Sequence, residues 1–102
     1  NVIQANLLSL VTTNEKAINT VYNVAYGDRN TLNDLMGYLK KYLSEFDSRI
    51  SNVEVIYGPN RAGDIPHSHA SVAKAKENLN YNPQFTLQQG LKEAVKWYWK
   101  NL

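Results

Sequence analysis

Apolar residues recur every three or four positions in three segments of the chain, which is the spacing of one face of an α-helix. These segments predict helices over residues 1–11, 32–46 and 87–102. Ser71 as a cap and Asn80 as a stop predict a further short helix over residues 72–79. The second segment has a long apolar stripe, which is typical of a helix that faces a hydrophobic core: Leu32, Leu35, Met36, Leu39, Leu43 and Phe46. In the last segment, Trp97 and Trp99 cannot share one face, so at least one should point towards solvent or a partner.

Residues that favour helix ends stand beside these segments. The N-cap candidates are Asn1, Asn30 or Thr31, Ser71, and Thr86, which forms a capping-box pattern with Gln89. Asn80 is expected to end the third helix, because asparagine tolerates the left-handed conformation that stops a helix. Residues 15–19 and 48–52 are mostly polar, and we expect them to be connecting loops.

Two other segments, residues 20–26 and 52–57, are rich in β-branched and aromatic residues and predict β-strands. A helix separates them, so they would form a β-α-β unit with parallel strands. The predicted fold class is therefore α/β, with about four helices and two parallel strands. Two strands alone make a poor sheet, which indicates that this region packs against something larger.

The composition limits the possible classes of protein. The chain has 102 residues, enough for at most one small domain. The absence of cysteine excludes disulfides and thiolate metal sites and fits a cytoplasmic protein. The net charge of +2 is scattered rather than clustered, and no nucleic-acid-binding motif is present, so no nucleic-acid partner is expected. No apolar run approaches the roughly 20 residues that span a bilayer, so no membrane association is expected.

The exposed turn after the second predicted strand carries the strongest candidate chemistry. Arg61 is able to grip phosphate oxygens with two parallel hydrogen bonds. Asp64 is able to accept hydrogen bonds from a pair of sugar hydroxyls, and Gly63 allows a ligand to approach the backbone. This pattern fits a nucleotide-sugar site. The alternative is a solvated loop with a surface pair of charges, which is what charged loop residues usually are.

Three further residues have no assigned role: His67, His69 and Arg29. His67 and His69 flank Ser68, but no third metal ligand stands at suitable spacing, and zinc sites use three or four protein ligands. A metal site is therefore not expected. Arg29 follows a turn at the mouth of the second helix, where a ligand-facing role and a structural role are equally compatible with the sequence.

Several of these motifs together resemble the C-terminal part of the extended short-chain dehydrogenase/reductase family, and within it the UDP-N-acetylglucosamine 4-epimerase group. The resemblance covers nearly the whole chain and is carried by residues 1–8, 21–25, 27–29, 61–64, 68–70, 74–76 and 79–83. Members of that group use bound NAD to invert C4 of a UDP-hexose. The resemblance implies that Arg61 holds the diphosphate, Asp64 the ribose, and Ser68 leaves space for an N-acetyl group.

The resemblance also implies that most of the enzyme lies elsewhere. None of the seven tyrosines is followed four positions later by lysine, and the five glycines do not form a dinucleotide-binding fingerprint. Residues 1–102 are therefore expected to be the C-terminal nucleotide-sugar-binding portion. The NAD-binding Rossmann domain would be absent from this chain, which would be inactive alone, while the intact enzyme would be a homodimer. The alternatives are a UDP-glucuronate epimerase, a nucleotide-sugar dehydratase, or a non-catalytic binding module.

Overall fold

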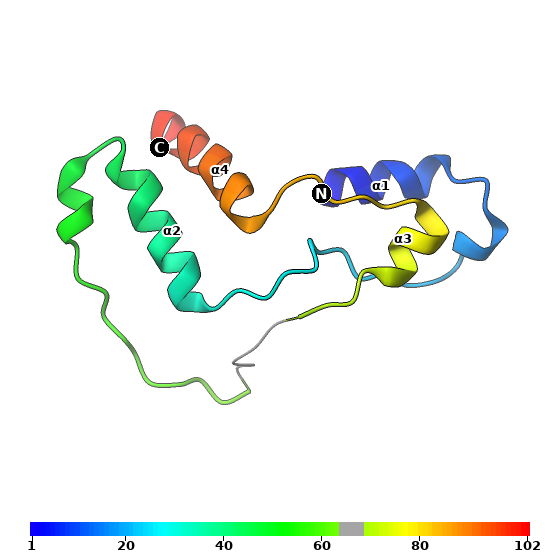
Figure 1. The fold of residues 1–102 in the computed structure, drawn as a ribbon, viewed down its shortest axis with the longest axis horizontal. Helices are drawn as coiled ribbons and strands as arrows, with labels where there is room; N and C mark the ends of the chain where they lie inside the picture. Colours follow the sequence, from blue (N-terminus) through cyan, green and yellow to red (C-terminus); the bar gives the residue numbers. More distant parts are fainter. Residues whose placement is uncertain (64–68) are drawn as a thin grey trace. The chain divides into compact units, whose positions relative to one another are not determined.

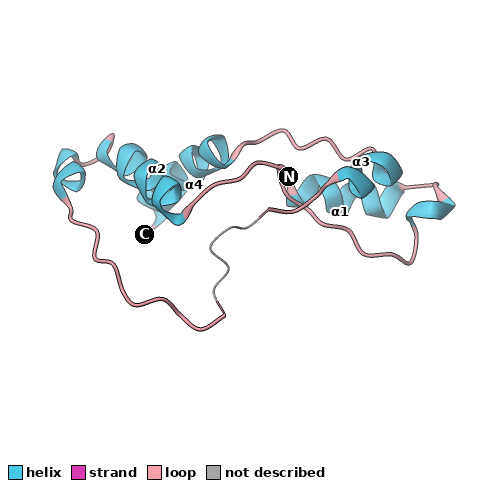
Figure 2. Ribbon diagram, turned by 60° about the horizontal axis from the view of Figure 1, so that its bottom comes forward, coloured by secondary structure: helices cyan, strands magenta, loops and turns pink. Residues whose placement is uncertain are grey.

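The computed structural model describes residues 1–63 and 69–102, and within these ranges the regular structure is entirely helical (Figures 1 and 2). Its elements are, in order, α1 (Val2–Val11), the 3₁₀ helix η1 (Glu15–Ala17), α2 (Leu32–Ser44), the 3₁₀ helix η2 (Ser48–Asn52), α3 (Ala73–Leu79) and α4 (Leu87–Asn101). None of the helices in these two ranges is both long enough and apolar enough to span a membrane.

The chain divides into two compact units, and each unit combines two separate stretches of sequence. Unit 1 comprises Asn1–Arg29 and His69–Thr86 and contains α1, η1 and α3. Unit 2 includes the described residues 30–63 together with Leu87–Leu102, and contains α2, η2 and α4.

The core of unit 1 is small and is closed by one aromatic side chain. Its fully buried members are mostly small residues, which let α3 approach α1 and η1 closely: Ala5, Ala17, Val72, Ala75, Leu79 and Tyr81. Tyr81 is only 2% exposed, and its hydroxyl donates a hydrogen bond of 2.7 Å to the carbonyl oxygen of Ala25. Burial raises the pKa of Tyr81 above its ordinary value of 10.0, because the charged phenolate would lose its hydration.

Hydrogen bonds to the side-chain amides of Asn1 and Gln4 hold the segment after α3 beside α1. The Asn1 amide accepts hydrogen bonds from the backbone N–H groups of Gln84 and Phe85, and it donates one of 2.6 Å to the Phe85 carbonyl. The Gln4 side chain accepts a further bond from the backbone N–H of Asn82. Asn1 occupies the N-cap position of α1, but its side chain makes no cap bond there. The expectation that Asn1 caps this helix through its side chain is wrong, because residues 84–85 use that amide.

Unit 2 is a pair of helices with a 3₁₀ turn beside them. α2 contacts both α4 and η2, with Tyr42 and Val95 buried between the elements. Phe46, just beyond α2, stacks on Trp99 with ring centroids 5.3 Å apart. Trp97 instead meets Tyr98 edge-on, so the two tryptophans point in different directions and both remain partly exposed, as expected from their spacing.

Of three other predicted helix ends, two agree with the structure and one differs. Thr31 and Asp34 form a reciprocal capping box at the start of α2, which confirms Thr31 as a cap. Asn80 adopts the left-handed conformation after α3, with φ 55° and ψ 30°, as predicted. Ser71 is not the N-cap, because α3 begins at Ala73 and Val72 takes that position.

The two predicted parallel strands are not seen in the described residues, and that part of the α/β prediction is wrong for this structure. Residues 20–26 and 53–57 are non-helical and are not assigned as strands. A strand needs a neighbouring strand to pair its backbone groups, and local β-propensity does not supply one. Lysine side chains form hydrogen bonds with some of the backbone carbonyl groups instead. Lys40 donates to the Val53 carbonyl at 2.6 Å, and Lys74 donates to the Val21 carbonyl at 3.0 Å.

The other differences are local. Residues 15–17 and 48–52, expected to be loops, form η1 and η2, and the side chain of Asn14 or Asp47 caps each one. The apolar stripe of α2 is only partly buried, with Leu35, Leu39 and Leu43 half-covered and Leu32 exposed. The stripe therefore predicted the helix correctly but overestimated how much of it is core.

Replacing Tyr81 should destabilise unit 1 in two steps. Tyr81→Phe removes the hydrogen bond to Ala25 and should lower the free energy of unfolding by about 1 kcal/mol. Tyr81→Ala also empties a buried volume and should lower it by about 3–5 kcal/mol. Urea denaturation followed by circular dichroism measures both values. Tyr57→Phe is the control, because Tyr57 is exposed and its substitution should have little effect; equal effects of the two Phe variants would contradict the role of Tyr81.

Acid should weaken the start of α2. Hydrogen bonds from the Thr31 backbone and hydroxyl hold the pKa of Asp34 below its ordinary value of 3.8. The native state therefore binds this proton less readily than the unfolded chain, so the stabilisation is present above about pH 4 and is lost as the pH falls below that range.

Residue-resolved NMR during an acid titration should show the first turn of α2 fraying in the wild-type protein. Asp34→Asn should remove this pH dependence, while Asp28→Asn should leave it unchanged. Fraying that persists unchanged in Asp34→Asn would show that another group is responsible.

Candidate functional site

The predicted nucleotide-sugar loop is only partly within the described residues. Arg61 is exposed, and it forms no ion pair with any residue in the described ranges. Gly63, two positions after Arg61, has φ +88°, a conformation that favours glycine. The chain therefore turns here, as the sequence indicates. Asp64, His67 and Ser68 lie outside the described residues, and the relation of Arg61 to Asp64 and Ser68 remains a prediction.

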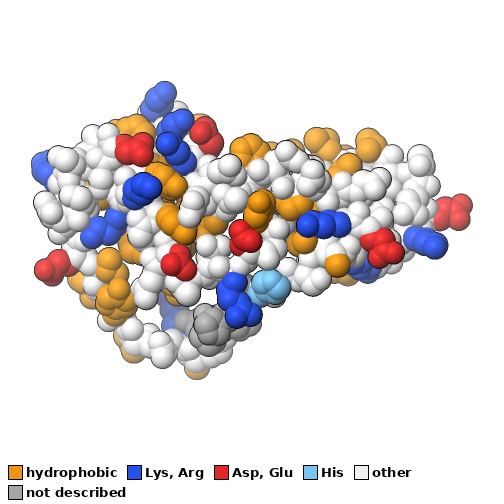
Figure 3. Space-filling model, viewed as in Figure 1, with side chains coloured by type: hydrophobic (Ala, Val, Ile, Leu, Met, Phe, Trp, Pro, Cys, Tyr) orange, Lys and Arg blue, Asp and Glu red, His pale blue; other side chains and the backbone are white. Residues whose placement is uncertain are grey.

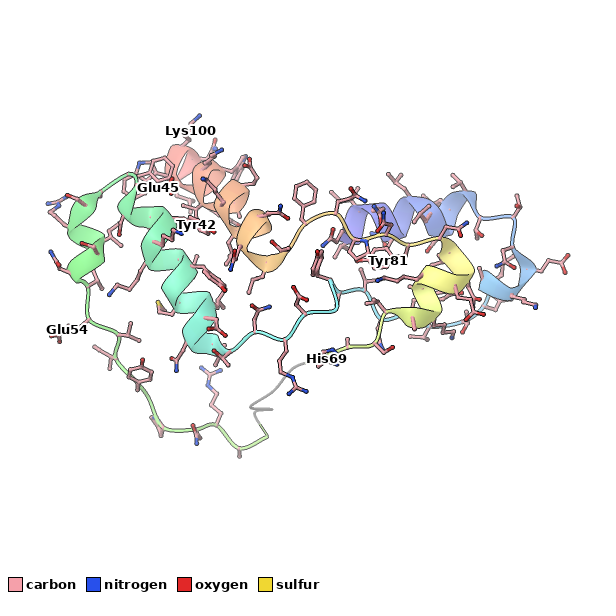
Figure 4. The ribbon with its side chains drawn as sticks, viewed as in Figure 1. Tyr42, Glu45, Glu54, His69, Tyr81 and Lys100 are labelled. Carbon is pink, nitrogen blue, oxygen red and sulfur yellow. The ribbon has the colours of Figure 1, made fainter. Side chains whose placement is uncertain are left out.

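A hollow of about 550 Å³ lies within unit 1 and begins where that loop ends. One side is the turn at Tyr26, Gly27 and Asp28, and the other is the segment that enters α3. The remaining lining residues come from this segment, from α3 and from the chain beyond it: His69, Ala70, Ser71, Val72, Ala73, Lys76, Asn82 and Pro83. Figure 4 labels His69, which precedes α3 at this edge of unit 1.

The backbone of Gly27 sets the shape of this hollow. Its φ of +102° is a conformation that residues with a side chain rarely adopt. A Cβ atom placed here would lie 3.6 Å from Cγ2 of Val72, which is ordinary van der Waals contact, so the requirement for glycine is conformational rather than steric. A neighbouring bond holds the two walls together, because the Asn23 amide donates to the Ser71 carbonyl at 3.3 Å.

The polar groups around the hollow have mixed charge. Asp28 contributes a carboxylate, Lys76 an ammonium group and His69 an imidazole, and all three are exposed. Such a set is able to form hydrogen bonds with a polar ligand without favouring a strong anion or cation. Among the described residues, no group of three or more His, Asp or Glu side chains is arranged to hold a metal ion.

Sequence reasoning did not predict this hollow. It identified the turn at residues 27–28 and left His69 without a role, but those residues meet only because Val72 packs near Gly27, 45 positions earlier. The glycine in a turn after an apolar segment was the available signal. Arg29, which follows the turn, is exposed and does not line the hollow.

Comparisons with known proteins give partial matches. The chain is 47% identical over 38 residues to UDP-glucuronate 4-epimerase 4 of Arabidopsis thaliana, which covers 37% of this chain and 9% of that protein. It is 28% identical over 101 residues to a Methanocaldococcus jannaschii protein named "Putative UDP-glucose 4-epimerase", which covers 99% of this chain and 29% of that protein. It is also 28% identical over 86 residues to UDP-N-acetyl-alpha-D-glucosaminuronate decarboxylase of Bacillus cytotoxicus, which covers 82% of this chain and 26% of that protein.

The chain therefore spans less than a third of the length of each of these relatives. No protein-family model and no solved structure matches it. The relatives are named for different UDP-sugars, so the comparisons do not single out UDP-N-acetylglucosamine 4-epimerase. The similarities support the epimerase/dehydratase family of nucleotide-sugar enzymes as the family to which this chain is related.

Proposed function

We propose that residues 1–102 form the UDP-sugar-binding portion of a nucleotide-sugar epimerase. The observation that carries this proposal is the Arg61-Ala62-Gly63-Asp64 turn, in a chain similar over 99% of its length to a protein named as an epimerase. Arg61 is exposed and unpaired among the described residues, so its guanidinium group is available to an anionic ligand. In this proposal Arg61 binds the diphosphate and Asp64 accepts hydrogen bonds from the ribose.

This chain does not fit the binding of NAD, the cofactor that the family resemblance implies. It has neither a glycine-rich dinucleotide fingerprint nor a tyrosine followed four positions later by lysine. In our proposal another part of the polypeptide binds NAD and carries the catalytic groups. The residues of this chain contribute substrate binding and positioning, and the 102-residue region alone has no epimerase activity.

Position 68 would determine which sugar is accepted. The small side chain of Ser68 leaves more room beside the ligand than a bulky aromatic residue would. Space at this position would accommodate an acetamido group on C2 of the sugar, so the proposed substrate is a UDP-N-acetylhexosamine.

A UDP-glucuronate 4-epimerase is the second candidate. The specific observation in its favour is the higher local identity, 47% over 38 residues, to the Arabidopsis enzyme of that name. A guanidinium group that binds a diphosphate serves either substrate, so Arg61 does not distinguish the two candidates. They differ in what the site must accept around the sugar, an acetamido group or a carboxylate. A non-catalytic module is less well supported, because the matches named above are to enzymes.

Substitution of Arg61 tests the binding of the diphosphate. In the full-length protein, Arg61→Ala should weaken UDP binding about 10- to 100-fold, because hydrogen bonds to charged groups are worth about 1.5–3 kcal/mol. Arg61→Lys should restore only part of this loss, since lysine lacks the bidentate fork. Isothermal titration calorimetry with UDP gives the affinities. Arg49→Ala is the matched control, because Arg49 pairs with Asp47 instead; equal affinities for the Arg61 and Arg49 variants would reject the proposal.

Substitution of Ser68 tests the identity of the sugar. Ser68→Tyr in the full-length enzyme should abolish turnover of UDP-N-acetylglucosamine and retain turnover of UDP-glucose, because the aromatic ring fills the space for the acetamido group. Ser51→Tyr is the control, because Ser51 is an exposed serine in η2, and this variant should leave both rates unchanged. Kinetic assays with both sugars and with UDP-glucuronate make the comparison. Turnover of UDP-glucuronate alone by the wild-type enzyme would favour the second candidate.

A further inference from the structure

The solvent-facing side of α4 carries three lysines in one row. Lys92, Lys96 and Lys100 follow one another at intervals of four residues, and all three are exposed. They lie within about 80° of one another around the helix axis, because successive residues are about 100° apart. Val95, on another side of the helix, is buried where α4 contacts α2. Figure 4 shows Lys100 pointing away from α2, so the row is open to solvent.

Two tryptophans flank this row. Trp97 and Trp99 lie about 100° and about 60° from Lys96, in opposite directions around the helix. Their side chains are 59% and 44% exposed. Phe46 stacks on Trp99 and Tyr98 meets Trp97 edge-on, so neighbouring rings support both indoles. We call the three lysines of the row and these two tryptophans the aromatic-basic face.

The aromatic-basic face is positively charged. Glu93 is the one acidic residue of α4, and it pairs with Lys96 at 3.2 Å. The other two lysines of the row therefore leave a net positive charge on this side of the helix. Figure 3 shows Lys and Arg side chains next to hydrophobic ones where α4 lies in Figure 1.

Helix α2 contributes a further cation beside the face. The ammonium nitrogens of Lys41 and Lys92 lie 5.9 Å and 6.0 Å from the centroid of the same ring, that of Tyr42, so the two charges are neighbours. Glu45, which follows α2, adds an exposed carboxylate, but lysines still outnumber acids here. The two helices of unit 2 thus present a cationic surface with exposed aromatic rings.

Lysines between exposed tryptophans are typical of a helix that lies on the surface of a lipid bilayer. An indole ring at the headgroup level meets apolar chains while its N–H group meets water, and lysines beside it approach the lipid phosphates. A protein partner fits this face less well, because lysine is depleted from the cores of protein interfaces. The expectation of no membrane association was based on the length that spans a bilayer, and a helix on the surface does not need that length.

We propose that the aromatic-basic face of α4 binds the surface of a bilayer that contains anionic lipids. The helix lies along the surface, with the two indole rings in the headgroup region and the lysines beside the lipid phosphates. The binding is peripheral and reversible, because two tryptophan side chains and a few charges provide all of it. This binding is independent of the UDP-sugar site and goes beyond the proposed function.

Vesicle sedimentation with the full-length polypeptide tests this proposal. The probes are vesicles of phosphatidylcholine alone and vesicles in which about one-third of the lipid is phosphatidylserine. We expect at least about tenfold tighter binding to the vesicles that contain phosphatidylserine, because they attract the lysines. The difference should disappear at about 1 M salt, which screens exposed charges over a few ångströms.

Substitutions assign the binding to named residues. Lys96→Gln and Lys100→Gln should each weaken binding to the anionic vesicles about fivefold, the effect of one lysine near such a surface. Trp97→Ala should weaken it about tenfold, because a partly buried aromatic contact with the lipid is lost. Lys16→Gln and Tyr57→Ala are the matched controls, since both residues are exposed and neither is on the face.

Equal binding to the two kinds of vesicle would overturn the proposal, and so would equal affinities of the face variants and the controls. Absence of vesicle binding would overturn it as well. In that case, an assembly of the full-length polypeptide that Trp97→Ala abolishes in size-exclusion chromatography would identify a protein as the occupant. Circular dichroism of each variant shows that the helices are retained, so that a loss of binding is not a loss of fold.

Discussion

The buried side chain of Tyr81, whose hydroxyl donates a hydrogen bond to the Ala25 carbonyl, is the feature on which unit 1 depends. It joins the segment after α3 to the segment before the Gly27 turn, and so it connects the two stretches of sequence that form this unit. The phenol is nearly inaccessible to water, which makes the bond difficult to replace. The other members of the core are mainly alanines, which contribute little apolar area of their own. One aromatic residue therefore supplies much of the apolar burial in this core.

The parts of the fold that the sequence predicted are those determined by neighbouring residues. Helical periodicity, the Thr31–Asp34 capping box and the left-handed Asn80 all depend on contacts within a few positions, and all are present. The parallel strands depend on a partner backbone, which residues 20–26 and 53–57 do not find in the described structure. Apolar spacing also does not tell which side of a helix faces inward. In α1 the side that carries the small Ala5 is packed, and the larger side chains of Ile3, Leu7 and Leu10 are exposed.

The candidate site shows the same division. The Gly63 turn beside Arg61 was predictable, because a glycine in a polar turn is a local signal. The hollow was not, because its two walls meet through contacts between residues about 45 positions apart, such as Gly27 and Val72. The family resemblance and the relatives agree on nucleotide sugars as the class of ligand. In our proposal the identity of the sugar depends on the side chain at position 68, and spacing along a chain does not determine what surrounds that side chain.

The interleaved construction of the two units has a consequence for biosynthesis. Asn1 bonds to the backbone of Phe85, and α2 packs on α4, so neither unit is complete in its early stretch alone. Until residues 69–86 have been made and have left the ribosome, α1 and η1 have no α3 to cover them. The apolar side of α1 that belongs to the core is then exposed together with the side chains of Ile3, Leu7 and Leu10, so the nascent chain presents an uncharged apolar helix. A chaperone that recognises short apolar segments would find its binding site there.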